Sequence, residues 1–234
     1  TNEVGVKYDL RKLSAVGSAA SSTFLIVMGK DQPIKSYEQL RNTKKTALFA
    51  ATGPGAGSYQ YPALLKQDGF NVKIITGVIG GQARFLSIER GEVNGTANSY
   101  ESTRKAIKEF GFIPILYNGA PIAALKGVPH IDTYLSKNGK AIAALMGAPL
   151  AAGRPFFTTP DVPADRLSIL RAAFKAALHD PKLLKEAKRA KRNVAWTDPS
   201  VMTRINQQIL GASDKVIAAF KAGAKKPKKD LSKF

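Results

Sequence analysis

Cysteine is absent from this 234-residue chain, and histidine is nearly so, with His130 and His179 as its only examples. Without cysteine there are no disulfides and no cysteine-based metal sites, which suits an exported protein that avoids mispairing. The histidines form no His-x-x-x-His or Glu-x-x-His pair, and no Gly-x-Ser-x-Gly motif occurs, so neither a metal site nor a serine nucleophile is expected. His179 is expected beside a helix cap, no partner is evident for His130, and the single tryptophan, Trp196, is expected to pack. The sequence therefore offers no catalytic residue, metal ligand or cofactor motif.

Long apolar runs are also missing. No stretch approaches the ~18 consecutive apolar residues of a membrane span. Residues 1–4 lack the basic start and the following apolar core of a signal peptide. The chain is therefore expected to be cytosolic, or to be a processed or truncated form.

Acidic residues are scarce, 17 against 36 lysines and arginines, which gives a formal charge of +19. Residues 181–234 hold 14 of the basic residues and 4 of the acidic ones, so this stretch carries much of the excess. A basic face can bind nucleic acid or anionic lipid. The basic tail at 225–229 has no interleaved aromatic residues for base stacking, and no nucleic-acid module stands out. A solvated surface is the favoured interpretation.

Segments of strand character alternate with helical ones in the middle of the chain, which predicts an α/β sheet. A capping box at Ser36 to Gln39 opens the first helix. The last third is mostly helical, with Asp-Pro helix starts at residues 180–181 and 198–199 and one final helix that runs past residue 216. Only one strand is clear before Ser36, so we expect these helices either to pack on the middle sheet or to cover strands that precede residue 1. The expected strands are 24–28, 46–50, 71–76, 92–98 and 112–117, and an extended segment is expected at 154–160.

A glycine-rich turn at residues 50–59 follows a strand and opens a helix. Backbone N–H groups and the helix N-terminus at such a turn suit an anion, such as a carboxylate or a phosphate. The turn is not a Walker loop and does not fit Gly-x-Gly-x-x-Gly, because its glycines alternate at 53, 55 and 57. Anion binding by backbone N–H groups and the hydroxyls of Thr52, Ser58 and Tyr59 is the preferred interpretation. A purely structural turn or a nucleotide site remains an alternative.

Three other stretches are candidates for the same site. A second glycine pair at 80–81 opens a helix, and residues 98–99 stand at the carboxyl end of a strand, where open α/β sheets bind ligands. The small polar residues 18–22 precede the first apolar strand. Simple turns, caps or loops are the alternatives at each position. The candidate ligand-binding residues are Thr52, Gly53, Gly55, Ala56, Gly57, Ser58, Tyr59, Gly80, Gly81, Gln82, Asn98, Ser99, Ser18, Ala19 and Ser21.

In the order of its motifs the chain resembles the solute-binding receptors of tripartite tricarboxylate transporters, the Bug-type periplasmic binding proteins. The matching segments are 8–17, 33–40, 52–58, 80–83 with 90–95, and 157–166 with 172–174 and 179–181. Asn94 stands where the family often has aspartate, and Pro54 is an addition to the first glycine loop. Family members begin with a strand-helix-strand-helix segment that is not seen here. The resemblance implies that the first part of the first domain is missing.

The resemblance implies a two-lobed, type II periplasmic-binding-protein-like α/β fold with a cleft between the lobes and an incomplete first lobe. The expected lobes are 1–30 plus 155–234, and 31–154. The implied function is capture of a small organic carboxylate, a dicarboxylate or an aromatic acid, between the lobes, for delivery to tripartite tricarboxylate-type membrane transporter subunits. A monomer that is exported to the periplasm, uses no cofactor and binds no nucleic acid is expected. Gly57→Asp is expected to abolish binding with little loss of fold. The alternatives are an α/β enzyme acting on a small anionic substrate and a basic nucleic-acid-binding module.

Overall fold

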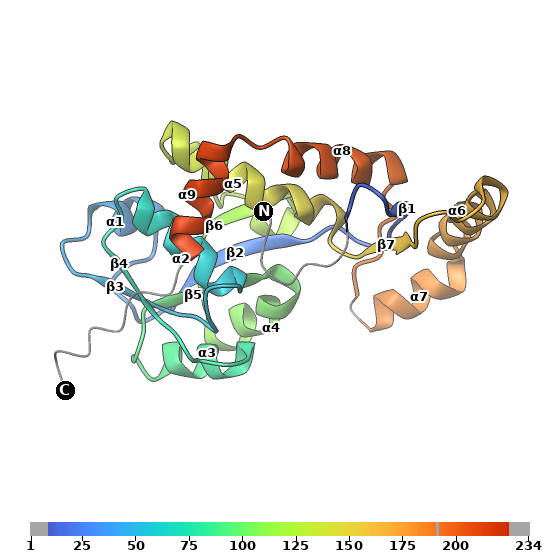
Figure 1. The fold of residues 1–234 in the computed structure, drawn as a ribbon. Helices are drawn as coiled ribbons and strands as arrows, with labels where there is room; N and C mark the ends of the chain where they lie inside the picture. Colours follow the sequence, from blue (N-terminus) through green and yellow to red (C-terminus); the bar gives the residue numbers. More distant parts are fainter. Residues whose placement is uncertain (1–8, 191, 225–234) are drawn as a thin grey trace. The chain divides into compact units, whose positions relative to one another are not determined.

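The computed structural model describes residues 9–190 and 192–224 (Figure 1). Contacts divide the chain into two compact units. Unit 1 comprises Thr1–Thr23, Gly119–Ile122 and Ala144–Ser213, and unit 2 comprises Phe24–Asn118, Ala123–Ala143 and Asp214–Phe234. The lobes expected from the sequence, 1–30 plus 155–234 and 31–154, remain a prediction. Among the described residues no helix combines the length and the apolar character needed to cross a membrane.

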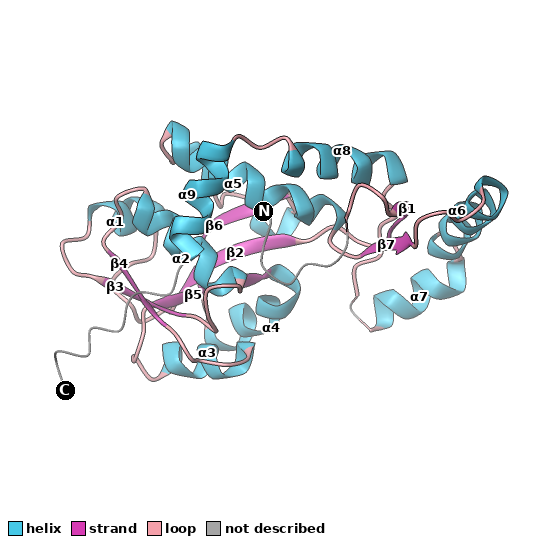
Figure 2. Ribbon diagram, in the orientation of Figure 1, coloured by secondary structure: helices cyan, strands magenta, loops and turns pink. Residues whose placement is uncertain are grey.

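Unit 2 is built on a five-stranded sheet with the strand order β4-β3-β5-β2-β6. Strand β3 pairs in parallel with β4 and β5, and β2 pairs antiparallel with β5. The β-α alternation predicted from the sequence is confirmed. Figure 2 distinguishes the strands from the helices around them. The strands are β2 (Thr23–Met28), β3 (Ala47–Ala50), β4 (Val72–Ile75), β5 (Gly95–Ser99) and β6 (Ile113–Gly119).

Helices α1 to α4 of this part of the chain begin near the residues that the local signals predict. Ser36 caps the first of them by accepting a hydrogen bond from the Gln39 amide, and Gly111 in the left-handed conformation ends the fourth. The helices are α1 (Tyr37–Asn42), α2 (Gly57–Gln67), α3 (Gly81–Glu89), α4 (Tyr100–Phe110), α5 (Lys137–Gly147) and α9 (Asp214–Ala224). The short 3-10 turns are η1 (Ala123–Leu125), η2 (Ile131–Thr133) and η3 (Ala148–Ala152).

The interior of the sheet is stabilised by the burial of β2 and by the hydrogen bonds of Asn94. The apolar run of β2 is almost fully buried, as expected for a strand covered on both faces. Asn94 lies just before β5, accepts a hydrogen bond from the Leu48 amide at 2.7 Å and donates one to the Gln32 side chain at 2.6 Å. The asparagine that departs from the family pattern therefore fixes β5 to β3.

Unit 1 contains a two-stranded antiparallel sheet of β1 (Ser14–Ser18) and β7 (Pro155–Thr158), whose register shifts between Ala15 and Gly17. The expectation of a single strand before Ser36 was wrong. Strand β1 has no apolar run, because serines and glycine interrupt it, and it forms by pairing with a segment about 140 residues away. The helices of unit 1 are α6 (Ala164–Leu178), α7 (Pro181–Arg189) and α8 (Pro199–Leu210).

The core of unit 1 is small. Met202 and Ile205 of α8 pack with Ala15 and Ala152, and partly buried apolar residues surround them. No residue of α6 is buried: Ile169 is 66% exposed and Leu170 44%. The apolar side of α6 is therefore only partly covered in the part of the chain that the structure describes.

The single final helix expected from the sequence is two helices. Gly211 ends α8, and α9 begins at Asp214. Helix α9 packs on α2, where the Gln67 side chain donates a hydrogen bond to the Ala219 carbonyl at 2.8 Å. The end of the described chain thus belongs to unit 2 and not to the helices before it.

Candidate functional site

The glycine-rich loop connects β3 to α2 and is closed by its own side chains. The Thr52 amide donates to the Ser58 hydroxyl at 3.2 Å, and the Ala56 amide donates to the Gly53 carbonyl at 3.0 Å. Among the described residues, none accepts a hydrogen bond from the amides of Gly53, Gly55, Gly57 or Ser58. Orphan N–H groups at a helix N-terminus carry the positive end of the helix dipole. The loop therefore presents several donors without acceptors.

The glycines of this loop serve different purposes. A Cβ at Gly57 would lie 2.5 Å from the Phe24 ring, which itself stacks on Tyr61 with a centroid distance of 4.9 Å. A Cβ at Gly53 or Gly55 would meet no atom within 4 Å. The expectation that Gly57→Asp costs little stability conflicts with this contact, because any side chain at 57 must displace Phe24. At positions 53 and 55, in contrast, a side chain would only cover the backbone.

The second glycine pair lies beside this loop. The Gly77 amide donates to the Thr52 carbonyl, and the Val78 amide donates to the Ala51 carbonyl, both at 3.2 Å. These bonds hold the segment that leads to α3 against the loop that leads to α2. The N-termini of the two helices thus lie at the carboxyl ends of the neighbouring parallel strands β3 and β4. Gly80 caps α3 with a φ of 87°, which favours glycine.

Asn98 and Ser99 stand at the end of β5. The Asn98 amide nitrogen is 3.3 Å from the position of a Cβ at Gly81, so it lies beside the start of α3. Ser99 caps α4, since its hydroxyl accepts from the Ser102 amide at 3.3 Å. Gln82 is exposed on the first turn of α3. The predicted residues of unit 2 therefore gather around the starts of α2, α3 and α4.

Arg84 of α3 was not predicted to belong to this group. It is only 6% exposed, and its Nη1 donates to the Thr52 hydroxyl at 2.7 Å. Its Nε is buried and has no hydrogen-bond partner in the described part of the chain. Burial lowers the pKa of this guanidinium. The available sequence signal was its position four residues before Ile88, on the helix face that Phe85 and Ile88 bury.

Tyr59 lies on a different side of α2. It is 4% exposed and packs with Ala51, Ala63 and Ile74. It also lines a cavity of about 540 Å³ together with Gly223 of α9. Burial raises the pKa of the Tyr59 hydroxyl. Its role in ligand binding stays a prediction.

The predicted residues of unit 1 take part in the β1–β7 sheet and its continuation. The Ser18 hydroxyl donates to the Ala20 carbonyl and accepts from the Arg154 amide, both at 3.1 Å, and the residue is fully buried. The Ala19 amide donates to the Arg154 carbonyl at 3.0 Å. Ser21 is partly buried. Ligand contacts by Ser18, Ala19 and Ser21 stay a prediction, and the hydroxyl of Ser18 already has two partners.

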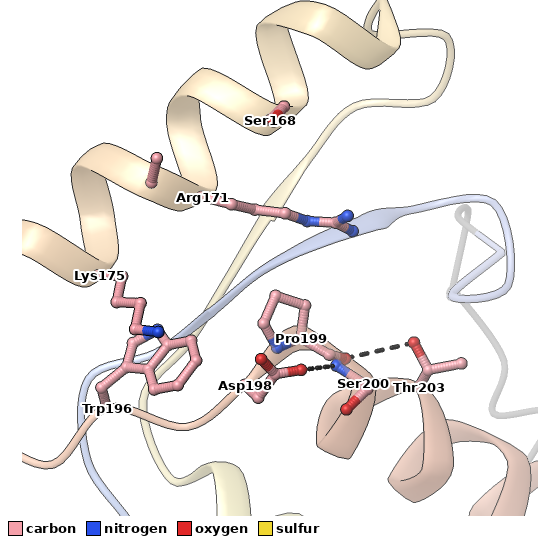
Figure 3. A pocket seen from close by; sticks show the side chains of 9 residues that line it. Ser168, Arg171, Lys175, Trp196, Asp198, Pro199, Ser200 and Thr203 are labelled. Carbon is pink, nitrogen blue, oxygen red and sulfur yellow. Dashed lines mark hydrogen bonds between the residues drawn. The ribbon is translucent and has the colours of Figure 1, made fainter.

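A cavity of about 560 Å³ in unit 1 was not expected from the sequence (Figure 3). Arg171 and Lys175 project into it from α6, and Trp196, Asp198 and the first turn of α8 form its other side. Its charged groups are engaged in the fold: Arg171 Nε donates to the Ala15 carbonyl at 2.9 Å, and the Lys175 ammonium lies 4.6 Å from the centre of the Trp196 ring. Asp198 accepts from the Ser200 amide at 2.8 Å. These contacts give the cavity's charges a structural role.

The two histidines have local partners. His179 ends α6, with Nδ1 2.7 Å from the Lys175 carbonyl oxygen, as the expected position beside a cap requires. His130 contacts the Asp132 carboxylate, so the expectation that it has no partner was wrong. In the described residues no three potential metal-binding side chains of the His, Cys, Asp and Glu types lie together.

Solved structures define the class of fold. No protein-family model matches the chain, and no curated protein matches it. A TctC solute-binding protein from Polaromonas, without ligand, is 14% identical with a TM-score of 0.68, over 90% of this chain and 72% of that one. The chain therefore has the α/β fold of periplasmic solute-binding proteins, and the predicted fold class is confirmed.

Two further solved structures of similar fold are complexes with organic acids. Rpa4515 of R. palustris, with adipate, is 16% identical with a TM-score of 0.60, over 93% of this chain and 72% of that one. MatC of Rhodopseudomonas palustris, with bound malate, is 15% identical with a TM-score of 0.57, over 94% of this chain and 73% of that one. The resemblance stated from the motifs is thus confirmed at the level of the fold.

Proposed function

We propose that this chain is a solute-binding protein of the TctC and Bug kind that binds a small organic carboxylate at the loop between β3 and α2. The observation that carries the proposal is the set of loop amides, Gly53, Gly55, Gly57 and Ser58, that have no acceptor among the described residues. The open space above Gly53 and Gly55 supports it, since these two glycines are not required by packing. Relatives in fold that are described with malate and adipate support a carboxylate as the anion.

The chemistry of binding follows from these groups. One carboxylate accepts hydrogen bonds from the amides at the start of α2, where the helix dipole favours negative charge. Bonds to a charged acceptor are shorter and stronger than neutral ones, so neutral donors suffice to hold the anion. Asn98, beside the start of α3, is the candidate donor for a second polar group of the ligand.

The location of the protein, its partners and its mode of action are proposed by analogy with the proteins of similar fold. The protein acts outside the cytoplasm, releases its ligand unchanged to membrane transporter subunits, and carries out no reaction. It works as a monomer that captures a dicarboxylate or an aromatic acid. Several proteins of similar fold are periplasmic or solute-binding proteins, which supports the location and the role. No finding favours the alternatives of an enzyme or of a nucleic-acid-binding module.

A thermal-shift screen with malate, adipate, benzoate and inorganic phosphate tests the proposal. At about 100 times Kd a ligand stabilises the folded state by about 2.7 kcal/mol, which raises the Tm of a chain of this size by roughly 5–10 °C. We expect at least one organic acid to produce this shift, and phosphate to produce a smaller one. A flat response to every acid would contradict the proposal.

Position 55 offers a matched pair of variants for locating the site. Gly55→Asp places a carboxylate in the open space above the loop, and Gly55→Ala adds only a methyl group there. We expect Gly55→Asp to abolish the shift caused by the acid and Gly55→Ala to retain most of it. Equal binding by both variants would place the ligand elsewhere.

A further inference from the structure

Arg84 is a buried cation without a buried anion. Its side chain is 6% exposed, and no acidic side chain of the described residues forms an ion pair with it. Within the described part of the chain its Nη1 donates to the Thr52 hydroxyl, and its Nε has no acceptor. Burial of an unpaired charge is costly unless a counter-ion compensates it. The described chain does not supply that counter-ion.

The contact with Thr52 directs this charge toward the loop. Thr52 is exposed and begins the loop whose amides lack acceptors. Because its hydroxyl oxygen accepts from Arg84, its own proton points elsewhere, and no described residue accepts that proton. A hydroxyl polarised by a guanidinium on one side is a better donor on the other. Arg84 thus makes the Thr52 hydroxyl a hydrogen-bond donor at the start of the loop.

We infer that Arg84 is the residue that gives this loop its preference for carboxylates over neutral ligands, by orienting the Thr52 hydroxyl toward the ligand and placing a positive charge behind it. This inference rests on the proposed function. Arg84 is a positioning residue, since it acts through Thr52. The ligand's carboxylate is the missing counter-ion of the buried guanidinium.

A structural role and a binding role of Arg84 predict different stabilities for the ligand-free variant. If Arg84 were a structural anchor, its removal would lower the stability of the ligand-free protein. If its counter-ion is the ligand, replacement by an apolar side chain of similar length removes an unpaired buried charge and leaves the ligand-free stability unchanged or higher. Arg84→Met is therefore expected to keep or raise the ligand-free Tm while it weakens binding.

The test is isothermal titration calorimetry with malate or adipate, whichever the wild type binds, and with the corresponding neutral diamide. We expect Arg84→Met to weaken binding of the acid at least tenfold, which corresponds to about 1.4 kcal/mol, and to leave binding of the diamide unchanged. Thr52→Val should weaken binding of the acid by a similar factor, and Thr52→Ser should retain binding. The double variant Arg84→Met, Thr52→Val should bind little worse than either single variant, because the two groups act in series.

Arg90→Met is the matched control, because Arg90 ends the same helix and its side chain is 69% exposed beside Glu92. It should bind the acid as the wild type does. If Arg84→Met binds the acid as the wild type does, the inference is overturned and the proposed function stands. A fall of roughly 5 °C or more in the ligand-free Tm of both Arg84→Met and Arg84→Lys would also overturn it, in favour of a structural anchor. A wild type that binds no acid overturns the proposed function, and the inference with it.

Discussion

Gly57→Ala tests whether the start of α2 is fixed by its contact with Phe24. The added Cβ would lie 2.5 Å from Cζ and 2.8 Å from Cε1 of the Phe24 ring, whereas carbon atoms prefer a separation of about 3.5–4.0 Å. The ring must therefore move by about 1 Å. The ring is stacked on Tyr61, which is 4% exposed, so this movement disturbs a packed pair.

Overpacking of this kind costs about 1–3 kcal/mol, which lowers the Tm of a chain of this size by roughly 3–10 °C. Urea unfolding followed by circular dichroism measures the change in the free energy of unfolding. Gly55→Ala is the control, since its methyl group meets no atom within 4 Å, and it should stay within about 0.5 kcal/mol of the wild type.

A second substitution checks the cause. Phe24→Leu shortens the ring that the new methyl group meets, so in combination with Gly57→Ala it should cost less than the sum of the two single changes. A positive coupling of about 1 kcal/mol is expected for residues in contact. Equal stabilities of Gly57→Ala and Gly55→Ala, or additive effects in the double variant, would refute the reasoning about Phe24.

Two further predictions concern groups outside the loop. The amide of Ser200, its hydroxyl and the nearby cations Lys175 and Arg171 hold the pKa of Asp198 below its usual 3.8, so the ionised group stabilises the folded state above that value and loses this effect as the pH falls. The difference in Tm between the wild type and Asp198→Asn should therefore shrink as the pH is lowered from about 5, and a constant difference would contradict this. Tyr61→Phe removes the hydroxyl that accepts from Asn118 at 3.1 Å, but Asn118 keeps its bond to the Ala143 carbonyl. The free energy of unfolding, measured with urea, should therefore fall by about 1 kcal/mol, and a fall of more than about 3 kcal/mol would show that the hydroxyl has a further role.

Local signals carried most of what the sequence predicts correctly. The capping of α1 by Ser36, the Asp-Pro starts of α7 and α8 and the glycine ends of α3 and α4 each depend on a few adjacent residues. The buried strand β2 is visible as a continuous apolar run for the same reason. The glycine loop is local as well, so its place between β3 and α2 follows directly from the sequence.

Features that depend on distant partners could not be predicted in this way. Strand β1 is stabilised by pairing with β7, and its sequence alone resembles a loop. The packing of α9 on α2 depends on Gln67 and Ala219, which are 152 residues apart. Arg84 resembles an exposed helical cation until the packing of α3 on the sheet buries it. The position of Arg84 beside this loop therefore depends on tertiary structure and could not be predicted from the sequence around it.

The bond from the Thr52 amide to the Ser58 hydroxyl affects the free energy of binding at this loop. It joins the two ends of the loop, so the loop is already ordered before a ligand arrives. The entropy of fixing these residues, on the order of 1 kcal/mol for each, is lost during folding and not during binding. Under the proposed function, a solute that reaches the loop meets donors in their final positions, and its affinity is not reduced by a further ordering step.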